Sequence, residues 1–172
     1  MKPSQIVLIV DDEPDLREVL QSMLRVITPQ ILTEGSGHEA LEILSKSPVD
    51  AVLSDISMPK MNGLELLSQI RNGGSEVPFV VLSGYSDRDT LAQALRLGAF
   101  DFVDKPFDRS SLIKLMMSAA DLGEALRMVD AQVDECFKGR SGEPASPEKL
   151  KQLKRATIIM RVQRAISLKK SA

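Results

Sequence analysis

The sequence contains very little cysteine, histidine or aromatic side chain. Its 172 residues include one cysteine, one histidine, no tryptophan, one tyrosine and five phenylalanines. The single cysteine, Cys136, cannot form an internal disulfide bond, and no cluster of histidine and cysteine indicates a zinc site. These shortages exclude a disulfide framework and a zinc-based architecture.

Long hydrophobic runs are also missing. No apolar stretch approaches the length of about 20 residues that a helix needs to cross a bilayer. The N-terminus, MKPSQ, leads directly into a short apolar strand and shows no signal-peptide core or cleavage site. We therefore expect a cytoplasmic protein that does not enter the membrane.

Charge is distributed unevenly, although the formal net charge is only -2. Residues 1–147 contain 14 Lys and Arg against 23 Asp and Glu, whereas residues 148–172 contain 8 against 1. Hydrophobic residues make up 43% of the chain, which is enough to fill a core. We predict one domain at residues 1–121 and an electrostatically distinct extension at residues 122–172.

Short apolar runs alternate with amphipathic segments through the predicted domain. The runs at 6–10, 31–32, 51–55, 78–82 and 100–103 are typical of strands, and a helical pattern follows each one. This alternation predicts a parallel sheet with helices on both faces, because right-handed crossovers place helices on each side. Two of the helices are expected to bury residues at helical spacing, namely Leu16, Val19, Leu20, Met23 and Leu24 in the first and Leu91, Ala94 and Leu95 in the fourth.

Polar residues close four of the five predicted strands. Asp11 and Asp12 follow the first strand, Asp55 ends the third, Ser83 follows the fourth and Lys105 follows the fifth. Each has an ordinary explanation as a turn, cap or surface residue, but the carboxyl ends of parallel strands share one crevice. Three carboxylates there would repel one another unless a hard cation such as Mg²⁺ neutralised them. Their joint placement therefore favours a metal-dependent site that handles phosphoryl groups, with the lysine and serine holding phosphoryl oxygens.

Four stretches, VLIVDDEPDLRE, VLSDISMPKMNGLELL, VVLSGYS and GAFDFVDKPFD, resemble the receiver domain of two-component response regulators. The resemblance covers residues 4–121 and implies a flavodoxin-like, doubly wound sheet with strand order 2-1-3-4-5. It implies that Asp55 accepts a phosphoryl group from a histidine kinase or a histidine phosphotransfer protein. It also implies that Mg²⁺ is bound directly by Asp12, Asp55 and the backbone carbonyl of Ser57, and by Asp11 through a water molecule.

The same resemblance gives roles to three further residues. Ser83 would move toward the phosphoryl group, Lys105 would form an ion pair with it, and Phe102 would turn into the space that the serine leaves. Phe102 also has a plain interpretation as a core residue, and both interpretations stay open. Ser57 and Gly84 are small, so we expect a phosphoryl group that is neither unusually protected nor actively cleaved.

The chemistry expected at Asp55 is attack by its carboxylate on a polarised phosphorus, which gives a labile acyl phosphate. The domain would thus catalyse only its own phosphorylation and dephosphorylation, and it would not be a turnover enzyme. The one histidine, His38, is expected on the surface. Without a second histidine, the chain cannot contain a histidine phosphotransfer module.

The last helix of the domain is predicted to continue into the extension. Residues 108–138 would form about 45 Å of helix, with Gly123 as a candidate weak point. Residues 139–147 predict a linker and residues 148–170 a basic amphipathic helix. Two arrangements stay open: the final helix folds back in the same chain, or 112–137 and 148–168 pair in a homodimer. The register is that of a coiled coil, with apolar residues Leu112, Leu115, Ala119, Leu122, Leu126, Val129 and Val133.

The leading hypothesis is a response regulator whose output is binding to a downstream protein target. The basic segment has no aromatic residues for base stacking and no partner helix for a helix-turn-helix, so nucleic acid is not the expected partner. A transcriptional regulator with a minimal basic DNA-binding tail is the alternative. A metal-dependent phosphohydrolase ranks last, because no free general acid follows the predicted nucleophile.

Overall fold

The computed structural model describes residues 5–84 and 88–138 of the chain. It divides into two compact units, Met1–Glu124 and Ala125–Ala172. The predicted linker at 139–147 and the predicted basic helix at 148–170 lie outside the described residues. None of the helices that are described is long and apolar enough to cross a membrane.

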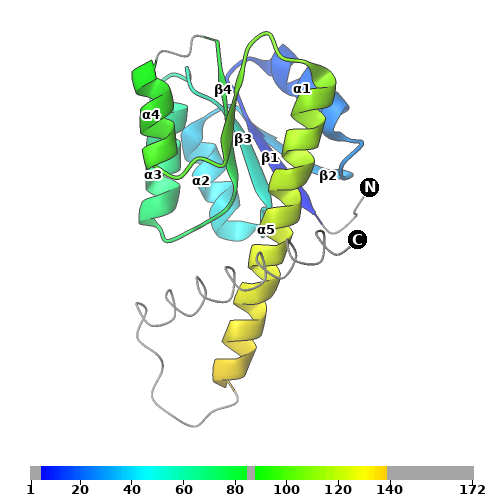
Figure 1. Ribbon diagram of the computed structural model, residues 1–172, viewed down its shortest axis with the longest axis vertical. Coiled ribbons are helices and arrows are strands. Elements are labelled where there is room, and N and C mark those ends of the chain that lie inside the picture. The colour runs from blue at the N-terminus through cyan, green and yellow to red at the C-terminus, as the bar shows by residue number, and fades with distance from the viewer. Residues whose placement is uncertain (1–4, 85–87, 139–172) are drawn as a thin grey trace, which may run out of the picture. The chain divides into compact units, whose positions relative to one another are not determined.

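The first unit is built on a five-stranded parallel sheet with strand order β2-β1-β3-β4-β5 (Figure 1). This confirms the predicted fold class and strand order. The elements, in chain order, are β1 (Ile6–Val10), α1 (Pro14–Leu24), β2 (Gln30–Glu34), α2 (Gly37–Lys46), β3 (Ala51–Asp55), α3 (Gly63–Asn72), β4 (Phe79–Ser83), α4 (Arg88–Arg96), β5 (Asp101–Asp104) and α5 (Arg109–Lys138).

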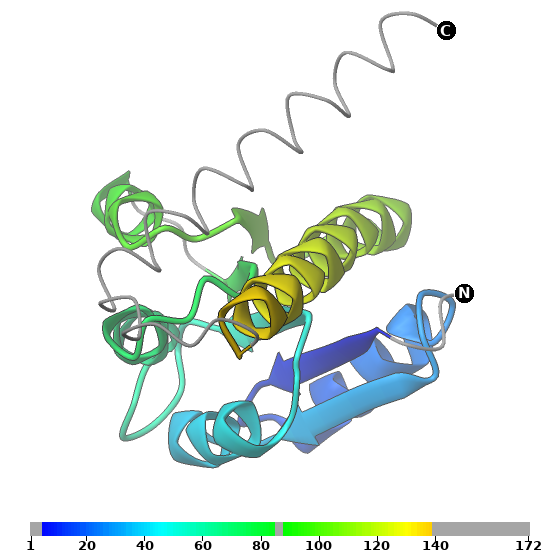
Figure 2. The same ribbon diagram turned by 90° about the horizontal axis from the view of Figure 1, so that it is seen from below.

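Helices cover both faces of the sheet, so the core has two halves (Figures 1 and 2). Successive side chains of a strand point to opposite faces. Val7 and Ile9 of β1 accordingly pack with residues of α1 and α5, whereas Leu8 and Val10 pack with residues of α2, α3 and α4. The central strands β3 and β4 are buried on both faces, so their sequences are apolar up to the polar residues at their carboxyl ends.

Two residues that were predicted to be buried are exposed. Val19 is 46% exposed and Leu95 is 60% exposed. The prediction was wrong because each helix meets the sheet through a narrower stripe, which includes the buried Leu20 and Leu24 in α1 and Ala94 in α4. Val19 and Leu95 lie one position away from that stripe, a rotation of about 100° around the helix axis.

Side-chain hydrogen bonds fix both ends of α3. The Asn62 side chain accepts hydrogen bonds from the amides of Leu64 and Glu65, and the Glu65 carboxylate accepts one from the Asn62 amide in return. At the other end, the Arg71 guanidinium donates to three backbone carbonyl oxygens at 2.9 Å, those of Ser75, Val77 and Gly98. Arg71 therefore joins the turn before β4 to the turn before β5.

Helix α5 continues without a break through Gly123, so the expected weak point does not interrupt it. The residue is buried, and a Cβ built on it would lie 1.6 Å from the carbonyl oxygen of Asp50, just before β3. Side chains reinforce this contact at the amino ends of the strands. The Gln5 amide donates to Asp121 Oδ1 at 2.8 Å and to Glu124 Oε2 at 3.1 Å. Asp50 Oδ2 accepts from the Ile6 amide at 2.8 Å.

Candidate functional site

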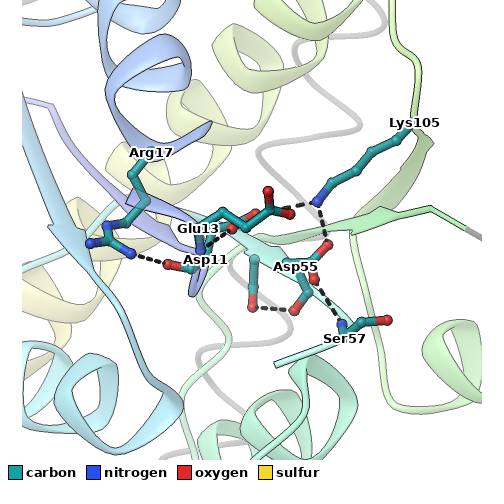
Figure 3. Close-up of polar contacts among 7 residues, drawn as sticks. Asp11, Glu13, Arg17, Asp55, Ser57 and Lys105 are labelled. Atoms are coloured by element: carbon teal, nitrogen blue, oxygen red, sulfur yellow. Dashed lines mark hydrogen bonds and ion pairs between the residues drawn. The ribbon is translucent and has the colours of Figure 1, made fainter. Parts of the chain in front are cut away.

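Three of the predicted site residues meet at the carboxyl edge of the sheet (Figure 3). The Nζ atom of Lys105, which follows β5, lies 2.7 Å from Asp55 Oδ1 and 3.3 Å from Asp11 Oδ2. Both carboxylates are buried, Asp11 with 0% and Asp55 with 5% of its surface exposed. The lysine thus neutralises part of the negative charge that two neighbouring buried carboxylates create.

Asp55 is the last residue of β3, and both its carbonyl oxygen and its carboxylate accept hydrogen bonds. The Ser57 amide donates to Asp55 Oδ2 at 2.9 Å, so the two carboxylate oxygens face different partners. The Asp55 carbonyl oxygen accepts from Ser54 Oγ at 2.9 Å. A Cβ on Gly63 would lie 2.3 Å from that same carbonyl oxygen, so only glycine lets α3 begin this close to the site.

Asp11 is held through both of its carboxylate oxygens. The Glu13 amide donates to Oδ1 at 2.9 Å and Lys105 Nζ donates to Oδ2 at 3.3 Å. Burial raises the pKa of Asp11, and the charge of Asp55 adds to this rise, while the Glu13 amide and Lys105 oppose it. The charged form of Asp11 is therefore costly here, and a further cation would stabilise it.

The carboxylates outweigh burial in their effect on the pKa of Lys105. Burial alone would lower its pKa, but the hydrogen bond and charge of Asp55, together with those of Asp11, outweigh burial and raise the pKa. The ammonium group stays protonated at neutral pH. The Lys105 amide also donates to the carbonyl oxygen of Ser83 at 2.7 Å, which places the end of β4 beside the residue that follows β5. Ser83 is 3% exposed.

The other predicted residues differ in burial. Asp12, Ser57 and Gly84 are exposed, and Phe102 is half-buried and packs against the core half that lies under α2, α3 and α4. In the part of the chain that is described, no group of three or more His, Cys, Asp or Glu side chains is arranged to hold a metal ion. The two buried carboxylates nonetheless form an all-oxygen donor set of the kind that Mg²⁺ prefers. His38 is exposed, as predicted.

Sequence reasoning missed Arg17, which contacts the site from α1. Its Nη1 donates a hydrogen bond to the backbone carbonyl oxygen of Asp11 (Figure 3). The residue stands on the first turns of α1 and is half-buried. In the sequence it cannot be told from any other charged residue of an amphipathic helix. Its contact depends on the fold of the loop after β1, which brings the Asp11 carbonyl oxygen close to it.

Comparison with known proteins identifies the family of the chain. The family model for the response regulator receiver domain matches residues 7–117. The response regulator protein PilR of Pseudomonas aeruginosa is 36% identical over 137 residues, which cover 80% of this chain and 31% of PilR. The DNA-binding transcriptional regulator NtrC of Escherichia coli is 39% identical over 114 residues, which cover 66% of this chain and 24% of NtrC. The chain thus spans a third or less of these relatives.

Solved structures with a similar fold are also found. The N-terminal domain of an uncharacterized protein from Wolinella succinogenes is 30% identical with a TM-score of 0.66, covering 71% of this chain and 98% of that domain. Chemotaxis protein CheY4 of Vibrio cholerae is 26% identical with a TM-score of 0.63, covering 67% and 98%. With the family model matching well over half of the chain, this protein belongs to the response regulator receiver domain family.

Proposed function

We propose that this protein is a phosphorylation-dependent signalling switch in the cytoplasm, in which Asp55 accepts a phosphoryl group from a histidine kinase or a histidine phosphotransfer protein. The observation that carries the proposal is the position of Lys105 Nζ, 2.7 Å from Asp55 Oδ1 and 3.3 Å from Asp11 Oδ2. A protonated amine held between two buried carboxylates at a strand end is placed to receive the oxygens of an incoming phosphoryl group.

In the proposed reaction, a carboxylate oxygen of Asp55 forms a bond to phosphorus as the bond between phosphorus and the donor's imidazole nitrogen breaks. The Ser57 amide, 2.9 Å from Asp55 Oδ2, sets the plane of the carboxylate before the donor arrives. Lys105 exchanges one of its carboxylate partners for a phosphoryl oxygen. The product is an acyl phosphate on Asp55.

The donor set for Mg²⁺ would be Asp11, Asp12, Asp55 and the backbone carbonyl of Ser57. Receiver domains generally bind Mg²⁺ at acidic residues. The ion would supply positive charge to the phosphoryl oxygens and reduce the repulsion between the carboxylates. The raised pKa of Asp11, caused first by burial, supports this assignment, because it marks a carboxylate whose charge is poorly compensated by the protein alone.

We further propose that Ser83 and Phe102 convert the modification into a change of surface. The Ser83 side chain is 3% exposed at the end of β4, and Phe102 is half-buried on β5, where it pairs with Val81. A movement of the serine toward the phosphoryl group would open space for the ring. The altered surface would be read by a downstream protein target, with α5 and the extension setting whether two chains pair.

The test is phosphorylation by a small acyl-phosphate donor with Mg²⁺, followed by intact mass measurement. The wild-type chain should gain the mass of one phosphoryl group, and Asp55→Asn should gain none. Asp50→Asn is the matched control, because Asp50 is a buried carboxylate directly before the first residue of the same strand. Equal adducts on the wild type and on Asp55→Asn would overturn the assignment.

A second candidate function is control of transcription through DNA. It is favoured by the relatives themselves, since NtrC is named a DNA-binding transcriptional regulator. The net basic charge of residues 148–172, with 8 Lys and Arg against 1 Glu, would have to supply the DNA contact. Binding of a 139–172 peptide to duplex DNA with a steep dependence on salt would support this function, and no binding at low salt would reject it.

A further inference from the structure

The backbone of Asp11 is held from two elements at once. Its amide donates to the Glu34 carbonyl oxygen at 3.2 Å, where β1 meets the end of β2. Its own carbonyl oxygen accepts from Arg17 Nη1, which comes from α1. A Cβ built on Gly35 would lie 3.3 Å from the same Nη1 and 3.7 Å from Cζ, so the guanidinium lies against the backbone after β2. Arg17 therefore sits between β1, α1 and the loop after β2.

We propose that Arg17 is a positioning residue for the acidic loop. By holding the Asp11 carbonyl oxygen, it orients the Asp11–Asp12 peptide and sets the direction of the Asp12 carboxylate toward the metal. This inference rests on the proposed function, because it concerns Mg²⁺ at that site. Arg17 contacts the backbone of Asp11, whereas the Asp55 carboxylate contacts Ser57 and Lys105, so the effect of Arg17 passes through the backbone of the loop.

The contacts around the loop explain why this one bond matters. The Asp11 side chain is already held at both oxygens by the Glu13 amide and by Lys105. Asp12 is exposed, so packing does not hold it in place. The peptide unit that carries the Asp11 carbonyl also carries the Asp12 amide, and a planar peptide turns as one body. Releasing the carbonyl therefore frees Asp12 more than Asp11.

The charge of Arg17 is directed away from the metal-binding carboxylates. Figure 3 shows its guanidinium on the side of Asp11 opposite to Lys105, facing the carbonyl oxygen. Its nearby acidic side chain is Glu34, whose pKa is raised by burial and by Glu39 while Arg17 acts to lower it. Removing Arg17 should thus loosen the loop without removing a competing cation from the carboxylates. The predicted effect is weaker Mg²⁺ binding.

The experiment is titration of the full-length chain with Mg²⁺ alone, by isothermal calorimetry, for wild type, Arg17→Ala, Arg17→Lys and Arg25→Ala. Arg25 is an exposed arginine just after the same helix and controls for the loss of one positive charge. Removing a residue that orients metal ligands typically weakens metal affinity about tenfold or more. We expect about a tenfold higher Kd for Arg17→Ala, a smaller increase for Arg17→Lys, and no change for Arg25→Ala.

A second measurement separates positioning from general stability. The rate of phosphorylation by a small acyl phosphate at saturating Mg²⁺ should be restored in Arg17→Ala to within about twofold of wild type, because metal then holds the loop itself. An unchanged Mg²⁺ Kd in Arg17→Ala, with only a lower melting temperature, would overturn the proposal. So would an equal loss of affinity in Arg25→Ala. If Arg17→Ala does not fold, Arg17→Lys decides by the same criterion. Absence of Mg²⁺ binding in the wild type would instead overturn the proposed function.

Discussion

Gly123 is the residue whose substitution tests the packing of α5 most directly. A Cβ at this position would lie 1.6 Å from the Asp50 carbonyl oxygen, whereas real Cβ atoms essentially never approach another heavy atom within 3.0 Å. The obstructing oxygen belongs to backbone that is tied to β1, since the Asp50 amide donates to the Ile6 carbonyl oxygen at 2.8 Å. In Gly123→Ala, α5 must therefore move away by about the difference, 1.4 Å.

The size of the effect follows from three contributions. Forcing a methyl group into a packed contact costs about 1 to 3 kcal/mol, and rigid backbone places this case at the upper end. Displacing α5 also weakens the hydrogen bonds from Gln5 to Asp121 and Glu124, each of which contributes about 1 kcal/mol. Alanine favours the helix over glycine by about 1 kcal/mol, which opposes the loss. We expect a net loss of about 2 to 3 kcal/mol and a melting temperature lower by roughly 6 to 12 °C.

Urea unfolding followed by circular dichroism measures this loss. Gly73→Ala is the matched control, because Gly73 is exposed, has φ of -71°, and would place its Cβ no closer than 3.4 Å to its neighbours. Its free energy of unfolding should change by no more than about 0.5 kcal/mol. Hydrogen exchange at the Ile6 amide, which donates to Asp50 Oδ2, should accelerate in Gly123→Ala. A Gly123→Ala chain as stable as the wild type would refute the close contact between α5 and Asp50.

Three further predictions address charge, loop anchoring and assembly. Asp11→Asn should raise the free energy of unfolding at pH 7, because burial raises the pKa of Asp11 and makes its charged form costly. The gain should vanish as pH falls through that raised pKa toward 3.8, and a gain that grew in acid would contradict it. Arg71→Ala should cost about 2 kcal/mol in urea unfolding, with only partial rescue by Arg71→Lys, since an ammonium cannot span three carbonyls; full rescue would refute this. If the extension pairs two chains, sedimentation velocity should show a dimeric full-length chain and a monomeric chain truncated after Glu124, whereas two identical monomers would reject pairing between chains and favour the fold-back arrangement.

The sequence predicts most of the first unit because its pattern is local. Continuous apolar runs that end in polar residues locate the strands, and their alternation with helices predicts which ends meet at one edge. This pattern alone predicts that Asp11, Asp55 and Lys105 meet at the carboxyl ends of the strands. The structure adds the distances and shows that the lysine contacts both carboxylates.

The features that the sequence does not predict depend on contacts between distant segments. Gly123 looks like a weak point of a helix until Asp50 is seen beneath it. Arg17 looks like a solvated helix residue until the Asp11 carbonyl is placed beside it. Leu95 looks like a core residue because periodicity gives the period of a helix more accurately than the centre of its buried face. In each case the deciding information is the position of a partner far away in the chain.

Helix α5 runs from the carboxyl ends of the strands to their amino ends, and this can link partner binding to phosphorylation. It begins at Arg109, four residues after Lys105 in the sequence, and its Gly123 packs against Asp50 at the amino ends of the strands. If phosphorylation of Asp55 shifts this helix, then any partner that prefers one position of the helix is linked to the phosphorylation equilibrium. Linkage is reciprocal, so the factor by which phosphorylation changes partner affinity equals the factor by which the partner changes the free energy of phosphorylation. A downstream target would therefore set the phosphorylated fraction of the protein as well as respond to it.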